Sequence, residues 1–404
     1  GGYQNIASGS DSTISGGCCN TSWTFSTISG GYSNLASGAC STIGGGCDNT
    51  ASSIHSTIGG GNKNITSGDY STIAGGCCNT SSGYYSFIGG GKGNTASANC
   101  STITGGRNNN SGGGWLSTIS GGYSNTSSGV ASSIGGGSNN ISSGDYSAIG
   151  GGCCNTSSGN NSTIGGGLSN ISSNEGSTIG GGGINTSSGY FSTISGGVRN
   201  SASGACSTIG GGCGNTASSI YSTIGGGNKN TASGCTSTVG GGCLNTASSY
   251  FSTVGGGSGN TASSYYSTVS GGRTNVASGQ ASTVGGGGSN TASGCCSTVG
   301  GGYNNTASSY YSTVGGGYLN TASGQNSTVG GGFQNISCGS YTGILSGRGN
   351  TASCADSMVV GSNIVTDRDC ATFVNNLSIM SIGTTASGLP AGAVWNDGGF
   401  LKIV

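Results

Sequence analysis

The sequence predicts an all-β fold, a flattened parallel β-solenoid of 15-residue turns with about 23 coils. First, a unit close to S-T-[IV]-G-G-G-x-x-N-[TI]-[AS]-S-[GS]-x-x recurs from Ser12 to a degenerate copy at Thr342. Second, only two units break step, one of them a residue short and the other, with Trp115, a residue long. Third, the chain combines 93 Gly with 4% charged residues, a composition poor in helix formers. A fixed short period is typical of one structural turn per repeat.

Each coil is expected to contain two short strands. With the Ser of S-T-[IV] as position 1, side-chain alternation groups positions 1 and 3 on one face, and positions 9 and 11 likewise. We place these four inside, so that Ile164 and Val314 belong to an aliphatic column and Asn170 and Asn320 to an asparagine ladder. The Thr at positions 2 and 10 then face outward. Positions 4–8 form a first corner, where the Gly at positions 5 and 6 permit positive φ, and positions 13–15 form a second corner.

The expected interior is thin. One Ile or Val and one small residue per coil bury little apolar area, while a Gly-rich backbone loses much entropy on ordering. Packing of several identical rods side by side would supplement this core, so we expect self-association.

Several classes of partner are disfavoured by composition. The formal net charge is zero and no basic patch exists, which argues against nucleic acid. No run of 18 apolar residues exists, so no membrane insertion is expected. The chain begins at Gly1 in mid-repeat without Met, and we expect a fragment or a processed product.

Runs such as STVGGGYNNTASSYYSTVGGGYLNTASG resemble the head repeats of trimeric autotransporter adhesins of the YadA-like type, and the repeats of phage and viral fibre proteins. The resemblance covers roughly residues 1–356. It implies parallel β-rolls, three chains side by side, that bind host surfaces or matrix. The family period is commonly 14 residues rather than 15, and no coiled-coil stalk or membrane barrel is visible here.

Residues 357–404 differ from the repeats of 1–356. Ala393-Val394-Trp395 and Phe400-Leu401-Lys402-Ile403-Val404 flank Asn396-Asp397-Gly398-Gly399, a strong hairpin signal. A solenoid needs its last strand edges covered. We therefore expect a C-terminal β cap that also trimerises, with Trp395 and Phe400 as cap residues, and the ending resembles C-terminal segments of phage and large-virus fibres.

The 18 Cys fall mainly at the two corners. Neighbouring coils never carry Cys at the same corner position, and coils two apart exceed disulfide reach. Free half-buried thiols, vicinal pairs such as Cys18-Cys19 and interchain disulfides all stay open. The candidates for interchain bridges are Cys40, Cys47, Cys206, Cys213, Cys235 and Cys243.

No combination of acid, base and nucleophile points to an enzyme, and no catalytic, cofactor or metal site is expected. Paired aromatics at positions 14 and 15 are either corner packing or an exposed ridge for a receptor or glycan. The candidate surface-binding residues are Tyr265, Tyr266, Tyr310 and Tyr311. Trp23 and Trp115, in the two out-of-step units, are expected to plug irregularities. Most Asn-x-Ser/Thr sequons use the position-9 Asn, which we place inside, whereas Asn161 and Asn326 lie at a corner.

These observations favour a structural fibre or adhesin, a rigid trimeric rod on a virion or cell surface that attaches to a host. Outward Thr ladders also resemble ice-binding β-solenoids, which gives a second hypothesis. A third is a subunit of an end-to-end extracellular filament.

Overall fold

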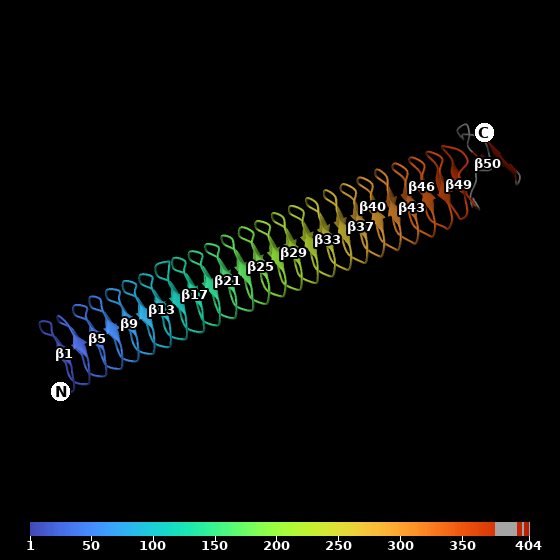
Figure 1. Ribbon diagram of the computed structural model, residues 1–404. Coiled ribbons are helices and arrows are strands. Elements are labelled where there is room, and N and C mark those ends of the chain that lie inside the picture. The colour runs from blue at the N-terminus through green and yellow to red at the C-terminus, as the bar shows by residue number, and fades with distance from the viewer. Residues whose placement is uncertain (376–393, 398–399, 404) are drawn as a thin grey trace. The chain divides into compact units, whose positions relative to one another are not determined.

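The computed structural model describes residues 1–375, 394–397 and 400–403 (Figure 1). It divides into two compact units, Gly1–Ala281 and Ser282–Val404, each described here by itself. The described residues form short β-strands and turns and no helix. The predicted parallel β-solenoid is confirmed, with about 25 turns counted over both units.

Each full turn contributes two two-residue strands, one at positions 2 and 3 and one at positions 10 and 11. In the first unit a representative turn has β22 (Thr163–Ile164) and β23 (Ile171–Ser172). In the second unit the equivalents are β42 (Thr313–Val314) and β43 (Thr321–Ala322). All position-2/3 strands of a unit form one parallel sheet, called sheet 1, and all position-10/11 strands form sheet 2.

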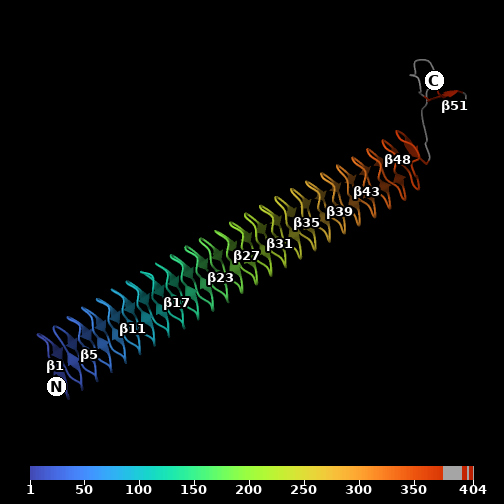
Figure 2. The ribbon, with the colours of Figure 1, turned by 45° about the horizontal axis from the view of Figure 1, so that its top comes forward.

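The strands of successive turns pair in register within each unit (Figures 1 and 2). In sheet 1, β22 pairs with β24 (Thr178–Ile179), so that Thr163 lies beside Thr178 and Ile164 beside Ile179. Like residues therefore stack on like residues. This is the direct consequence of a period shared by sequence and backbone.

The backbone is hydrogen-bonded in both directions along the stack. The position-2, -4, -7, -10 and -12 N–H groups donate to carbonyls of the next turn, as Thr306 N donates to Asn320 O at 2.8 Å. The residues at positions 8 and 15 have φ near +55°, for example Asn304 and Tyr311. This left-handed conformation reverses the peptide, so that Asn304 N donates to Gly288 O of the preceding turn at 2.9 Å. Each corner is thus tied to both neighbours.

The interior contains the four positions expected inside. Ile164 and Val314 at position 3 and Asn170 and Asn320 at position 9 have no exposed surface. The Ser at position 1 is also buried, and where position 11 is Ser the two hydroxyls bond, as Ser157 and Ser162 do at 2.6 Å. The Thr at positions 2 and 10 are mostly half-buried, on the outer faces of the two sheets.

Both out-of-step units change length at the second corner, positions 13–15. Sheet 1 keeps its register, because Thr13 still pairs with Thr27 and Thr102 with Thr118. Trp115 lies in its altered corner, and Trp23, at position 12, directly precedes the other. The expectation that they plug irregularities is wrong, because they are 52% and 65% exposed. The corner absorbs the missing or extra residue by changing its own path at the surface.

The repeat pattern ends in the second unit, but strand pairing continues past residue 356. β48 (Met358–Val360) pairs in parallel with β46 (Gly343–Ile344) and with β49 (Thr372–Val374). The asparagine ladder ends because Ile364 N, rather than another Asn, donates to Asn350 Oδ1 at 3.0 Å.

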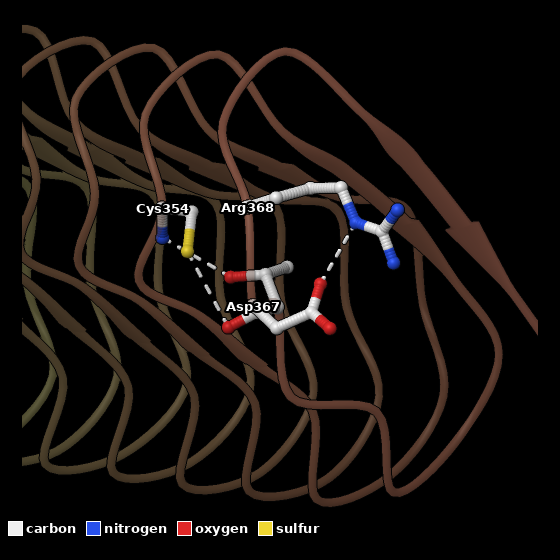
Figure 3. A network of polar contacts seen from close by, with 4 residues as sticks. Cys354, Asp367 and Arg368 are labelled. Atoms are coloured by element: carbon white, nitrogen blue, oxygen red, sulfur yellow. Dashed lines mark hydrogen bonds and ion pairs between the residues drawn. The ribbon is translucent and has the colours of Figure 1, made fainter.

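Polar contacts near the end of the repeat involve Cys354, Asp367 and Arg368 (Figure 3). The Thr366 hydroxyl accepts hydrogen bonds from the backbone N–H groups of Ser353 and Cys354 at 2.9 and 3.1 Å. The Cys354 thiol donates to the Thr366 carbonyl at 3.4 Å, and Asp367 forms an exposed ion pair with Arg368 at 3.0 Å. The Thr366 hydroxyl takes the place of the next-turn carbonyl that accepts from position 12 in regular turns, while Cys370 keeps the left-handed φ of 54° and donates to Ala355 O at 3.1 Å.

The expected C-terminal hairpin strands are present. β50 (Val394–Asp397) pairs antiparallel with β51 (Phe400–Ile403), which places Trp395 opposite Lys402. The turn residues Gly398 and Gly399 lie outside the described residues. The role of residues 357–404, with Trp395 and Phe400, as a trimerising cap stays a prediction.

Candidate functional surfaces

The asparagine ladder fixes the first corner, and with it every surface feature there. Asn170 Nδ2 donates to Gly166 O of its own corner at 3.0 Å and to Gly182 O of the next turn at 3.0 Å. Its Oδ1 accepts from Asn185 N at 3.0 Å. One buried side chain therefore joins two turns and closes its own corner, which satisfies polar groups that would otherwise be buried without partners.

The second corner carries the expected aromatic pairs, and they are exposed. Tyr265 is 39% exposed and Tyr266 53%, with ring centroids 4.6 Å apart in an edge-to-face arrangement. Tyr266 also stacks on Phe251 of the preceding turn at 5.0 Å. Partial burial of Tyr265, together with the nearby Tyr266, raises the pKa of its hydroxyl above the usual value. In the second unit, Tyr310 and Tyr311 are also exposed and lie 4.8 Å apart.

The first corner carries an aromatic column that sequence reasoning missed. Tyr303, Tyr318 and Phe333 occupy position 7 in three successive turns of the second unit. Their rings stack almost parallel, with centroids 5.6 and 5.5 Å apart. The signal was present as aromatic residues spaced by one full period. Tyr303 and Tyr318 in this column are 53% and 44% exposed.

Thr side chains form single-file rows on the outer faces. In the first unit, sheet 1 has an uninterrupted row at position 2 from Thr163 to Thr268. Phe87, Ser133 and Ala148 interrupt the row nearer the N-terminus. On sheet 2, Ile65, Ile141 and Ile171 stand among the Thr and are each 42% exposed. At positions 2 and 10 the two outer faces are therefore uncharged and partly apolar.

The cysteines are free within the chain. Cys40 and Cys213 are exposed, and Cys47, Cys206, Cys235 and Cys243 are half-buried. In sequence these six form the pairs Cys40/Cys47, Cys206/Cys213 and Cys235/Cys243, each with its two members at opposite corners, and their bridging between chains stays a prediction. Vicinal thiols do come together, as Cys77 and Cys78 show with a sulfur–sulfur distance of 3.0 Å.

No group of three His, Cys, Asp or Glu side chains arranged to hold a metal is found in the part of the chain that the structure describes. A search of the same residues for a helix long and apolar enough to cross a bilayer also finds none.

Comparison with known families gives one match. Residues 26–38 match the model of the Ubiquitous surface protein adhesin repeat. This segment includes β4 (Thr27–Ile28) and β5 (Leu35–Ala36), and runs from position 1 to position 13 of one unit. The curated proteins give no match. The chain thus has the fold of a β-solenoid repeat protein and one turn similar to a surface adhesin repeat, in agreement with the resemblance to adhesin repeats.

The burial of most sequon asparagines predicts that N-glycosylation prevents the chain from folding. Those whose Asn is a buried ladder residue are Asn20, Asn64, Asn79, Asn109, Asn125, Asn140, Asn155, Asn170, Asn185 and Asn335. A glycan on such an Asn removes an Nδ2 donor and cannot fit inside the coil. We expect that expression through a secretory pathway that N-glycosylates nascent chains yields glycosylated, unfolded protein, measured by glycosidase gel shift and circular dichroism.

A matched variant replaces the position-11 Ser or Thr of those sequons by Ala, the residue found there in Ala262 and Ala307. It should restore folding and secretion. A wild-type chain that is glycosylated on ladder residues and still shows the native spectrum would contradict the buried ladder.

Proposed function

We propose that this chain is a structural, adhesin-like β-solenoid of a cell surface or extracellular particle, and that it holds binding surfaces away from that surface. The observation that carries the proposal is the match of one solenoid turn to a surface adhesin repeat. Because the same unit recurs along the chain, the other turns have a similar sequence to the turn that matches the adhesin repeat. A repeat stack with an interior of Ile, Val, Asn and Ser supports a mechanical role rather than catalysis. A virion fibre is the alternative setting.

We infer that the exposed aromatic pairs of the second corner contact the host receptor or glycan. Tyr and Phe present large, rigid apolar surface with a polar edge, which suits stacking on sugar rings and protein surfaces. The pairs at Tyr250-Phe251 and Tyr265-Tyr266 lie on adjacent turns and contact each other, with Tyr250 and Tyr265 centroids 5.7 Å apart. Together they make a larger patch than a single turn can supply.

Immobilised wild-type chain should bind cultured cells, purified matrix proteins or a glycan array. Replacing Tyr265-Tyr266 by Gln-Ala and Tyr310-Tyr311 by Gln-Asn copies the native pairs Gln280-Ala281 and Gln325-Asn326. We expect this variant to keep the fold and lose binding at least about tenfold, which corresponds to about 1.4 kcal/mol. Replacing Tyr303 and Tyr318 by Asn, as found at position 7 in Asn228, is the matched control. Equal binding by wild type and the first variant would remove the aromatic pairs from the proposal.

We also propose that three copies assemble side by side. The thin interior and the flat outer faces with exposed Ile65, Ile141 and Ile171 support this. A mass in solution of three chains is expected. If Cys40, Cys47, Cys206, Cys213, Cys235 or Cys243 bridge chains, a covalent multimer appears on a gel without reductant and disappears with it. A monomeric mass would contradict the trimer, and a monomer band without reductant would contradict the bridges.

A specific observation also favours ice binding as a second candidate, namely the regular row from Thr163 to Thr268 on a flat outer face. A thermal hysteresis assay distinguishes the two. Substantial hysteresis that is lost when Thr residues in the middle of the row are replaced by bulky residues would support ice binding. The absence of hysteresis would contradict ice binding and favour the adhesin-like role.

A further inference from the structure

Vicinal cysteines recur at the corners of the solenoid in four places. Cys18-Cys19, Cys77-Cys78 and Cys153-Cys154 occupy positions 7 and 8 in the first unit, and Cys295-Cys296 occupies positions 14 and 15 in the second. The sulfur–sulfur distances are 3.2, 3.0, 2.9 and 3.5 Å, in that order. All eight thiols are half-buried or exposed at the surface.

The corner backbone brings these thiols together. Along an extended strand, adjacent side chains point to opposite faces, so vicinal thiols would diverge. Here the second Cys of every pair is left-handed, with φ of 59°, 58°, 61° and 55° for Cys19, Cys78, Cys154 and Cys296. This conformation turns the second side chain back toward the first.

Other residue types show the same effect. At the second corner, the rings of Tyr84 and Tyr85 are 4.3 Å apart, and those of Tyr190 and Phe191 are 4.4 Å apart. At the first corner, the Cys47 thiol reaches the carboxylate of its neighbour Asp48 at 3.5 Å. Pairing of adjacent side chains is therefore a property of the corners, and two adjacent cysteines there form a converging dithiol.

From this geometry we propose that the four vicinal pairs are chelating dithiol sites for trivalent, monosubstituted arsenicals. Sulfur ligands favour soft, thiophilic centres, and two converging sulfurs close a ring that a single thiol cannot. The ligand needs only two sulfurs, because its organic substituent fills the third position.

The reaction is balanced without an oxidant. The two S–H bonds and the As=O bond break, two S–As bonds form, and the two protons leave with the oxygen as water. Arsenic stays trivalent. The hydrogen bond between the paired thiols, followed by burial, raises the pKa of the Cys77 thiol above its usual value, which favours the protonated form that this reaction consumes.

Phenylarsine oxide is the probe, titrated against the reduced full chain. We expect one equivalent per pair, four in all, that resists excess 2-mercaptoethanol and is released by 2,3-dimercaptopropanol. A variant with Cys19→Ser, Cys78→Ser, Cys154→Ser and Cys296→Thr should lose this resistant binding completely. Ser169 and Thr236 show that these residues occur naturally at positions 8 and 15.

A control variant replaces the single position-7 cysteines, Cys47, Cys213 and Cys243, by Ser, which occurs there as Ser138. It should still bind four equivalents, and circular dichroism should show the same fold for all three proteins. Release of the probe from wild type by monothiol would overturn the proposal. Retention by the first variant, or loss in the control, would place the binding between other cysteines and overturn it as well.

Discussion

Replacing Asn170 by Ala should destabilise the first unit by on the order of 5 kcal/mol, one of the two largest single-site effects expected in this chain. Asn170 Nδ2 donates to Gly166 O and Gly182 O, and its Oδ1 accepts from Asn185 N. Truncation leaves Gly166 O and the Asn185 N–H without these partners, whereas Gly182 O still accepts from Leu168 N at 2.9 Å. Each buried polar group left unpaired costs about 1–3 kcal/mol. Chemical denaturation followed by circular dichroism measures the loss.

Two further variants identify the cause of that loss. Asn170→Asp keeps the shape but replaces the Nδ2 donor by an oxygen that faces two carbonyls. We expect it to destabilise the unit at least as much as Ala does. Asn161 is exposed at the second corner, where Ala131 occurs natively with φ of 52°, so Asn161→Ala should change the stability by less than about 0.5 kcal/mol. A stable Asp variant would show that the ladder contributes by volume rather than by hydrogen bonds.

Gly302→Ala should separate two turns of the second unit and cost at least about 3 kcal/mol. Gly302 has φ of 85°, which strains any residue with a Cβ, and a Cβ there would lie 2.1 Å from Gly317 O of the next turn. It would also meet Nδ2 of the ladder residue Asn305 at 2.7 Å. The position-6 Gly is thus required both for its backbone conformation and for close approach of successive turns.

The neighbouring Gly301 is a matched control, since it differs by one position in the same corner. A Cβ on Gly301 meets nothing within 4 Å and its φ is not positive. Gly301→Ala should leave the denaturation midpoint within about 0.5 kcal/mol of wild type, or raise it slightly by reducing the freedom of the unfolded chain. Equal destabilisation by both substitutions would show that the corner is sensitive to any side chain.

The period and the interior could be predicted because each coil repeats the same chemistry. Ile164 and Asn170 could be placed inside from strand alternation and from the recurrence of Ile or Val at position 3 and of Asn at position 9, and both are buried. The positive φ expected at positions 5 and 6 occurs regularly only at position 6, as in Gly302. Position 6 packs against the backbone of the next turn, as Gly302 does against Gly317, and this contact cannot be predicted from the sequence of a single coil.

The left-handed residues at positions 8 and 15 could not be predicted from residue type. Lys63, Leu244 and Tyr311 all adopt this conformation, although such residues rarely do. Hydrogen bonds to the preceding turn hold them there, as Lys63 N donates to Cys47 O at 3.0 Å. The surface pairs of thiols and rings follow from that backbone, and for this reason the sequence alone left vicinal thiols as one alternative among several.

The two corners should tolerate evolutionary change in chain length very differently. At positions 13–15, the unit near Trp23 is one residue shorter and the unit near Trp115 one residue longer than the others, and the pairing of both sheets is intact in each. Between positions 5 and 9, by contrast, the Asn170 side chain reaches back over a fixed number of residues to Gly166 O. An inserted or deleted residue there would break this hydrogen bond. Changes in chain length, and inserted loops or tags, should therefore be tolerated at positions 13–15. Positions 5–9 should instead keep a fixed number of residues.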